Sequence, residues 1–374
     1  MNILIIAHFQ NDGSPYVSFV HDQALAYKAL GHNVYVISPV VCNKKEAEVY
    51  KGKKEKYIDG IRVFYPRYLS ISKYGRYGIN AFLGFYSVNK IVKKIINGFH
   101  PDIIHAHTIG FDGAISVRLK EKYNIPVSIT AHGSDVVIPI EDKKLSYIIS
   151  ICRRANTVVT VSSKLKNILI KEAPDLNVQV ILNGFNNQYC SEVPKKKHSI
   201  IQVSNLIEQK KVDITLKAVA TLYKEYRDVT LTVIGDGPEK NHLKELCTQL
   251  NISDIVNFTG QISNCEVLKR MSETEVFIMP SIKEGLGIVY LEAMASGCLT
   301  IGTRGEGIED IIKNKVNGFL IEADNIEMII TYVRSCFENT EYNKLITQNG
   351  KESVKVLTWE TNAKKYTSLF EEII

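Results

Sequence analysis

Short apolar runs rich in β-branched residues alternate with amphipathic stretches along the whole chain. This alternation predicts strands separated by helices, the pattern of parallel α/β sheets. In the first half, the predicted strands are residues 3–7, 34–38, 103–106, 127–130, 157–161 and 178–182, with a first helix over about 16–30. In the second half they are residues 199–203, 230–234, 255–258, 276–279, 299–301 and 319–321, and a last helix is expected over 361–374.

The alternation breaks between residues 191 and 198, where Pro194 precedes three consecutive lysines. We interpret this segment as a linker between two domains, residues 1–190 and 199–357. The predicted fold is α/β, with two Rossmann-like doubly wound sheets facing a central cleft at the carboxyl ends of their strands, where such sheets bind ligands. The sequence contains neither Gly-x-Gly-x-x-Gly nor Gly-x-x-x-x-Gly-Lys-Ser/Thr. The main motif evidence for a nicotinamide dehydrogenase or a P-loop enzyme is therefore missing.

Composition narrows the class of protein further. Its 45% hydrophobic and 23% charged residues are typical of globular proteins, and 374 residues suffice for two cores. Apolar runs of the roughly 18–20 residues that span a bilayer are missing, and residues 1–8 have the pattern of a buried strand rather than a signal peptide. Seven scattered cysteines without a Cys-x-x-Cys pair favour reduced thiols over a zinc site or disulfides, so we expect a cytoplasmic protein.

The net charge of +6 is unevenly distributed. Residues 1–190 carry 24 Lys and Arg against 14 Asp and Glu, whereas residues 198–374 carry 19 against 25. The basic first half favours an anionic partner. Residues 44–56 and 62–96 mix basic and aromatic side chains, a pattern that fits either an anionic membrane surface or a solvated face above core aromatics. It also suits single-stranded nucleic acid, but nothing else in the chain supports that partner, so none is predicted.

The strongest chemical motif is the segment 280–297. A predicted strand ends at Met279, a turn with Gly285 and Gly287 follows, and then a helix begins near Leu286. Glycines let the backbone approach a ligand, and a helix amino terminus offers free N–H groups to an anion. Seven residues separate Glu284 from Glu292, whose azimuths are close, so one carboxylate can meet a sugar and the other a ribose. The alternative is a glycine-capped amphipathic helix with two solvated acids.

This segment resembles the signature of the retaining family 4 glycosyltransferases of the GT-B fold, with Leu286 in place of the usual Phe. The resemblance implies that Glu284 contacts the donor sugar and that Glu292 binds the ribose of a nucleotide-sugar. It also implies that sugar and phosphate meet the amides of the turn, Gly285, Leu286, Gly287 and Ile288. Thr358-Trp359-Glu360 is similar to the family's tail, so the helix within 358–374 is expected to cross back to the first domain.

A second resemblance follows the first strand of the second half. Lys210 occupies the position of the family's diphosphate-binding lysine, which implies that it stabilises the departing nucleoside diphosphate. Asn205 replaces the family's arginine, so part of this phosphate clamp loses its charge, and Lys211 is the residue available to compensate. The alternative for Lys210 is an ordinary loop lysine.

In the first half, the segment 130–135 resembles the family's His-Gly-x-Asp segment, which implies that His132 lies beside the reacting carbon of the donor sugar. Asp135 is expected either to orient His132 or to cap the next helix. His107 is expected either to contact the acceptor or to pack in the core. Gly13 lies in the loop after the first strand, where the family has a glycine close to diphosphate and acceptor, unless it belongs to a plain turn.

The resemblance implies a retaining, metal-independent transferase that moves a sugar from a UDP- or GDP-sugar to a hydroxyl group. The expected acceptor is a glycan or a polyprenyl-diphosphate-linked lipid in cell-surface polysaccharide synthesis, on the inner face of the membrane. Since no Asp-x-Asp pair occurs, neither a metal nor a cofactor is expected. The first domain would bind the acceptor and the second the nucleotide-sugar. Alternatives are a nucleotide-sugar epimerase or phosphorylase on the same fold, or a non-catalytic partner that binds nucleotide-sugar.

Overall fold

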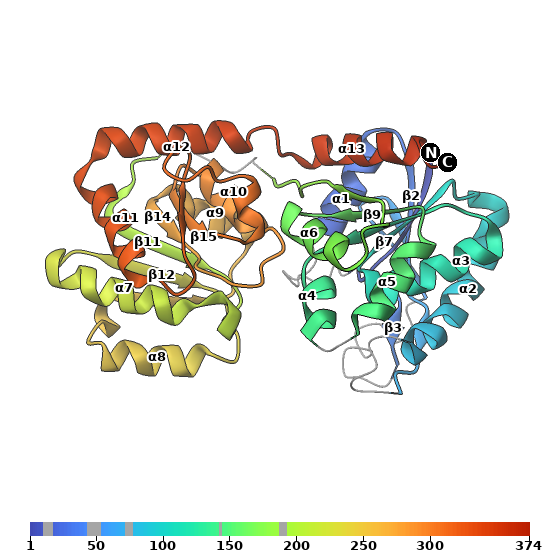
Figure 1. The fold of residues 1–374 in the computed structure, drawn as a ribbon, viewed down its shortest axis with the longest axis horizontal. Coiled ribbons are helices and arrows are strands. Elements are labelled where there is room, and N and C mark those ends of the chain that lie inside the picture. Colours follow the sequence, from blue (N-terminus) through green and yellow to red (C-terminus); the bar gives the residue numbers. More distant parts are fainter. Residues whose placement is uncertain (10–17, 43–53, 72–77, 142–143, 187–192) are drawn as a thin grey trace. The chain divides into compact units, whose positions relative to one another are not determined.

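The computed structural model describes residues 1–9, 18–42, 54–71, 78–141, 144–186 and 193–374. The chain forms two compact units (Figure 1). Unit 1 comprises Met1–Gly184 together with Trp359–Ile374, and unit 2 comprises Phe185–Thr358. In the described part of the chain, no helix combines the length and apolarity needed to cross a membrane.

Unit 1 is built on an eight-stranded sheet with the order β10-β9-β8-β7-β1-β2-β5-β4. Its strands are β1 (Asn2–Ile6), β2 (Asn33–Ile37), β4 (Glu55–Ile58), β5 (Ile61–Phe64), β7 (Ile103–His107), β8 (Val127–Ala131), β9 (Thr157–Thr160) and β10 (Val178–Val180). The pairs are parallel except β4–β5, which is antiparallel. Every residue of β7 and β8 is buried, as expected for central parallel strands covered on both faces.

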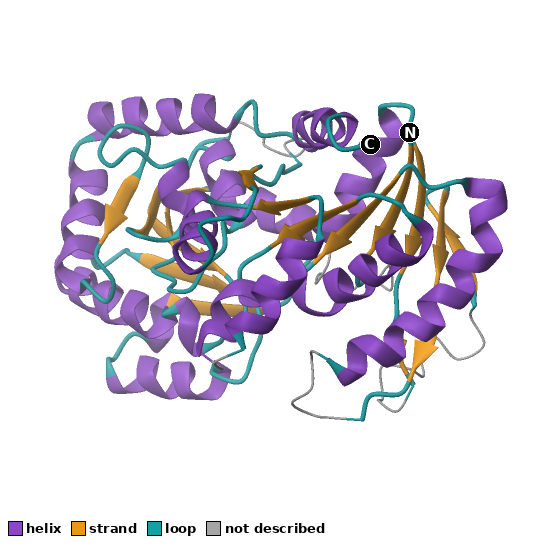
Figure 2. Ribbon diagram, turned by 45° about the vertical axis from the view of Figure 1, so that its right-hand side comes forward, coloured by secondary structure: helices purple, strands orange, loops and turns teal. Residues whose placement is uncertain are grey.

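Helices lie on both faces of this sheet (Figure 2). They are α1 (Ser18–Ala29), α2 (Ile79–Phe99), α3 (Ala114–Tyr123), α4 (Ser134–Glu141), α5 (Leu145–Arg154), α6 (Ser163–Glu172) and α13 (Trp359–Glu371). A π-helical turn, Ile109–Gly113, leads from β7 into α3, and β3 (Val40–Val41) pairs with β6 (Arg67–Tyr68) in a separate small sheet. The helix α13 packs on α1, so the carboxyl-terminal segment completes the first unit, in the place predicted for it.

Unit 2 is built on a six-stranded parallel sheet with the order β13-β12-β11-β14-β15-β16. Its strands are β11 (Lys196–Val203), β12 (Thr230–Ile234), β13 (Val256–Gly260), β14 (Thr274–Ile278), β15 (Leu299–Thr303) and β16 (Phe319–Ile321). Its helices are α7 (Val212–Glu225), α8 (Lys240–Gln249), α9 (Asn264–Ser272), α10 (Ile288–Ala295), α11 (Ile326–Glu338) and α12 (Thr340–Val354). Counted along the unit, the strand order is 3-2-1-4-5-6, that of the Rossmann fold.

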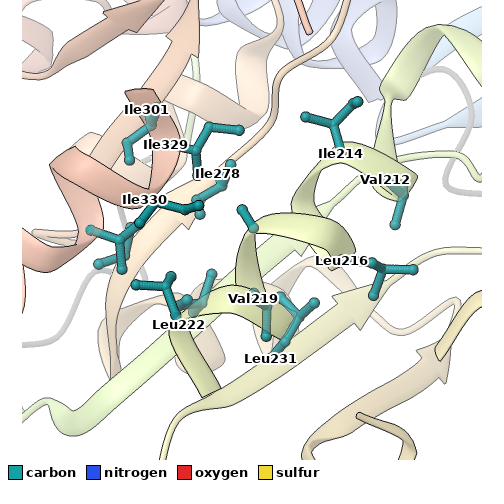
Figure 3. Packing of buried hydrophobic residues seen from close by; sticks show 14 of the residues in the cluster. Val212, Ile214, Leu216, Val219, Leu222, Leu231, Ile278, Ile301, Ile329 and Ile330 are labelled. Atoms are coloured by element: carbon teal, nitrogen blue, oxygen red, sulfur yellow. The ribbon is translucent and has the colours of Figure 1, made fainter. Parts of the chain in front are cut away.

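The core of unit 2 shows why this sequence forms these elements. Residues spaced three or four apart on α7, among them Leu216, Val219 and Leu222, face the sheet, and Figure 3 shows them beside Leu231 of β12. Ile329 and Ile330 of α11 pack into the same cluster. The helical period therefore places one apolar face of each helix on the apolar surface of the sheet.

The predicted α/β class with two doubly wound parallel sheets is confirmed, and every predicted strand is present within a few residues of its expected ends. The predicted boundaries need correction. The units divide between Gly184 and Phe185, upstream of the predicted linker 191–198, and unit 2 extends to Thr358. Within that predicted linker, β11 already begins at Lys196, because its backbone N–H donates to the Glu273 carbonyl and the residue pairs with Thr274 of β14.

Candidate functional site

The site residues of unit 2 lie where the strand order of its sheet reverses, between β11 and β14. Lys210 lies in the loop after β11 and Glu284 in the turn after β14. Two hydrogen bonds fix these segments: the Ile282 N–H donates to the Gln209 carbonyl at 2.9 Å, and the buried Gln202 amide donates to the Lys210 carbonyl at 2.9 Å. The carboxyl ends of strands at such a switch point are the usual ligand position in these sheets.

The Lys210 ammonium forms an ion pair with the Glu284 carboxylate. The two side chains are 20% and 16% exposed, so the pair is partly withdrawn from water but still reachable from solvent. Attraction between opposite charges is stronger in such a position than on an open surface. The structure thus brings together two residues that are 74 positions apart in sequence and that the sequence analysis assigned to phosphate and sugar.

The turn that carries Glu284, residues 282–287 and called here the Glu284 turn, leads directly into α10. Gly287 has φ 79° and precedes the helix, which begins at Ile288 rather than near Leu286 as predicted. A Cβ at Gly287 would lie 2.7 Å from the Tyr290 ring, so only glycine fits there. Gly285 and Leu286 are buried, whereas Ile288 is half-buried in the first turn of α10, whose amides have no partner within the helix.

Glu292 lies in the second turn of α10 and is 9% exposed. Its Oε1 accepts a hydrogen bond of 2.9 Å from the Asn264 side chain at the start of α9. A buried carboxylate needs such partners, because burial without them is costly. Asn264 was not identified in the sequence analysis, since an asparagine at the start of a helix is an ordinary capping residue there.

Asn205 and Lys211 occupy the same loop as Lys210. Asn205 is exposed. The Lys211 ammonium pairs with Asp324 at 3.2 Å, and its backbone is left-handed with φ 51° at the start of α7. That backbone conformation explains why the resembling family has glycine at this position.

In unit 1, His107 ends β7 and His132 follows β8, so the parallel pairing of these strands brings the two imidazoles together. His107 Nδ1 lies 3.1 Å from His132 Nε2, and the rings are nearly parallel with centroids 5.3 Å apart. Phe19 of α1 covers His132 at a centroid distance of 4.5 Å. His107 is buried, and its Nε2 has no hydrogen-bond partner among the described residues.

Asp135 holds the backbone around these histidines. Its Oδ1 accepts hydrogen bonds of 2.9 Å from the backbone N–H groups of His132 and Gly133, and its Oδ2 accepts one of 3.1 Å from Ile109 N–H. Asp135 therefore fixes the backbone at His132, directly before α4. It also joins the loops that follow β7 and β8.

The histidine cluster is uncharged at neutral pH. Burial lowers the pKa values of His107 and His132 below the usual 6.5, and the nearby Asp135 only partly offsets this for His132. Burial also lowers the pKa of His105, next to them on β7, to about 3. A neutral imidazole can donate one hydrogen bond and accept another, which suits contact with a sugar hydroxyl.

Two neighbouring residues escaped the sequence analysis. Thr108 has φ 87°, a conformation that a β-branched residue rarely adopts, and its hydroxyl donates to Asp112 at 2.9 Å. Burial and the nearby Asp135 raise the pKa of Asp112 to about 8, although the hydrogen bond from Thr108 opposes this. Strained backbone is common at functional sites, but neither feature has a signature in a single sequence.

Gly13, predicted to lie near the diphosphate, is outside the described residues. Within the described ranges, no three His, Cys, Asp or Glu side chains are arranged to hold a metal ion.

Comparison with known proteins gives two family matches that follow one another along the chain. The model described as Glycosyltransferase Family 4 matches residues 17–189, and the model described as Glycosyl transferases group 1 matches residues 188–353.

Relatives and solved structures agree with these matches. An uncharacterised glycosyltransferase of Methanocaldococcus jannaschii is 30% identical over 285 residues, 76% of this chain and 79% of the relative. The alpha-monoglucosyldiacylglycerol synthase of Acholeplasma laidlawii is 24% identical over 377 residues, 93% of this chain and 90% of the relative. HepE of Anabaena, solved in complex with UDP and glucose, has a TM-score of 0.77 at 18% identity, with all of each chain covered. The last likeness shows a shared fold.

Proposed function

The chain belongs to the family 4 glycosyltransferases, and on that premise we propose that it transfers a sugar, with retention of configuration, from a UDP- or GDP-sugar to an acceptor hydroxyl. The acceptor is a glycan or a lipid-linked sugar used in cell-surface polysaccharide synthesis. The pairing of Lys210 with Glu284 at the switch point of the unit 2 sheet supports this function most directly. The UDP and glucose bound by HepE, and the lipid glucosylation named for the Acholeplasma relative, agree with such a donor and acceptor.

The donor half of the reaction needs charge stabilisation. As the bond between the anomeric carbon and the phosphate oxygen breaks, the nucleoside diphosphate takes the electron pair and gains negative charge. Lys210 and the free amides at the start of α10 meet that charge, so no metal is required. Glu284 accepts hydrogen bonds from the sugar hydroxyls, and Glu292, oriented by Asn264, accepts from the ribose.

The acceptor half of the reaction involves unit 1. The acceptor oxygen bonds to the anomeric carbon on the face that the phosphate leaves, and its proton passes to a phosphate oxygen. Neutral His132 holds a hydroxyl of the donor sugar, with its loop fixed by Asp135. His107 fixes the ring of His132 through their 3.1 Å contact, so it acts as a positioning residue rather than a core residue alone.

Peripheral membrane binding fits this role. Five large apolar side chains of unit 1 are exposed within a short stretch of sequence: Leu69, Ile71, Ile79, Phe82 and Tyr86. The last three of these lie on α2, and three exposed lysines follow on that helix: Lys90, Lys93 and Lys94. Apolar and basic side chains together bind anionic lipid surfaces. Flotation with anionic liposomes should carry the protein at low salt but not at high salt, and no flotation at low salt would contradict membrane binding.

Calorimetry in the presence of a chelator tests the donor site. UDP, GDP, ADP and their common sugars are titrated into the protein, and we expect saturable binding of one uridine or guanosine family without metal. Transfer to an acceptor then separates this function from its alternatives: an epimerase releases a new nucleotide-sugar without an acceptor, and a phosphorylase needs phosphate. A folded protein that binds none of these ligands would contradict the donor site. Binding without any turnover would favour the non-catalytic partner.

A further inference from the structure

A second glycine-containing loop, residues 304–307, follows β15 and packs against the Glu284 turn. A Cβ added to Gly307 would lie 1.8 Å from the Gly285 carbonyl oxygen and 2.9 Å from the Leu286 Cα, so the two backbones are in direct contact. In addition, Glu306 Oε2 accepts a hydrogen bond of 2.6 Å from the Glu284 backbone N–H. The loop after β15 thus contacts the turn through both its backbone and a side chain.

The backbone conformation of the Glu284 turn is energetically unfavourable by itself. Lys283, directly before Glu284, has φ 62°, and Gly287 has φ 79°. A non-glycine residue in the left-handed region costs on the order of 1 kcal/mol or more, so the surroundings must stabilise it. The Ile282 N–H is held by the Gln209 carbonyl at the start of the turn, and the Glu284 N–H is held by Glu306 in its middle.

The Glu284 and Glu306 carboxylates lie at the same turn but have different partners. The Glu284 and Glu306 carboxylates both lie near the buried Tyr290 hydroxyl, and both add to the effect of burial that raises its pKa. Two carboxylates repel one another at short range. With Glu306 bound to the amide, in a charge-assisted hydrogen bond, the Glu284 carboxylate is left to Lys210.

We propose that Glu306 is a positioning residue for the donor sugar: it holds the Glu284 turn so that the Glu284 carboxylate and the turn amides meet the sugar. This inference rests on the proposed function. In the proposed function the diphosphate contacts Lys210, in the loop after β11, and the ribose contacts Glu292, on α10. Since Lys210 and Glu292 lie outside the Glu284 turn, loss of Glu306 weakens recognition of the sugar more than binding of the nucleoside diphosphate.

Hydrogen exchange in the ligand-free protein tests the contact itself. In Glu306→Ala, amides of residues 282–287 should exchange about tenfold faster than in the wild type, the factor expected for loss of a hydrogen bond to a charged group. Glu306→Gln should stay near the wild type, because its amide oxygen can accept the same N–H. Glu309→Ala is the matched control, since Glu309 accepts from the Gly305 N–H in the same loop. Unchanged exchange in Glu306→Ala, or equal acceleration in Glu309→Ala, would overturn the proposal.

Calorimetry with UDP and with UDP-glucose tests whether the Glu306 contact affects recognition of the donor sugar. We expect Glu306→Ala to lose about tenfold in affinity for UDP-glucose and to stay within about twofold of the wild type for UDP, with Glu306→Gln restoring most of the loss. An equal loss for both ligands, or none for either, would overturn the positioning role. A wild-type protein that binds neither these ligands nor the guanosine pair GDP and GDP-mannose would instead contradict the proposed function, while hydrogen exchange still decides whether Glu306 holds the turn.

Discussion

Lys210 illustrates how a single residue changes partners during the proposed reaction. Its ammonium is paired with Glu284, and both side chains are mostly withdrawn from water. Removing one member of such a pair leaves the other charge uncompensated. A diphosphate offers the ammonium more negative charge than one carboxylate does, and transfer of Lys210 to the diphosphate frees Glu284 for the sugar.

Lys210→Ala should therefore reduce kcat by about 10²–10³, the size of effect seen when one preorganised charge-stabilising group is removed. Steady-state kinetics with the natural donor measures it. Lys217→Ala is a suitable control, because Lys217 lies on α7, is 41% exposed and pairs with Asp213 one helical turn away. A Lys210→Ala enzyme with wild-type turnover would remove Lys210 from the phosphate site.

Strands with a clear apolar run could be predicted from the sequence, at the sheet edge as well as in its centre, whereas the edge strand β4 was not predicted. The buried strands β1, β7 and β8 are short apolar runs, so their pattern was unambiguous. In contrast, β4 exposes three of its four residues, so it lacks the apolar run of a buried strand. Antiparallel pairing with β5 through the two-residue turn Asp59-Gly60 specifies β4, and this Asp-Gly turn is a local hairpin signal that was overlooked.

The candidate site shows a limit of another kind. The motif around Glu284 and the spacing to Glu292 could be recognised, because they lie within one segment. Glu306 could not, since its partner is a backbone N–H 22 residues away and the contact depends on how the loops after β14 and β15 pack. Asp135 was identified from the sequence, but its hydrogen bonds to both the loop after β7 and the loop after β8 could not be predicted.

The helix α13 provides a prediction at the scale of an element. Phe370 is fully buried against Tyr27, Tyr366 and His105, and loss of such a ring costs about 3–5 kcal/mol. Phe370→Ala should therefore lower the melting temperature of unit 1. The chain's one tryptophan, Trp359, begins α13 and is 6% exposed, so its fluorescence reports this unit. Lys365→Ala, on the exposed face of α13, should leave the melting temperature unchanged, and equal shifts would contradict the docking of α13.

At the scale of the whole molecule, both sheets have the same strand order around their first strand. In unit 1 the reversal lies between β1 and β7, and in unit 2 between β11 and β14. Each unit therefore presents loops from the carboxyl ends of its strands at a switch point, and the candidate residues lie on these loops in both units. The histidines and Asp112 of unit 1 are titratable groups near the switch point of its sheet. The stability of unit 1 should therefore depend on pH.

The free energy of unfolding of unit 1 should be greatest near pH 6.5. His105, His107 and His132 have lowered pKa values in the folded state, so the unfolded state binds more protons and stability falls as pH drops below about 6.5. Asp112 acts in the opposite direction. Its pKa is raised from 3.8 to about 8 by burial and by Asp135, so the folded state binds the extra proton and stability falls as pH rises from about 4 to about 8.

Asp112→Asn isolates the Asp112 contribution, because asparagine resembles the protonated acid and can still accept from Thr108. Thermal melts followed by Trp359 fluorescence between pH 6.5 and 8.5 should show the wild type losing stability, by at most about 1.4 kcal/mol per pH unit from this group, while Asp112→Asn loses much less. Asp175→Asn is the control, since Asp175 is exposed, pairs with Arg153 and is ionised in both folded and unfolded states over this range. Parallel curves for wild type and Asp112→Asn would show that Asp112 is ionised in the folded protein, and the strain at Thr108 would then be held by a charged rather than a neutral partner.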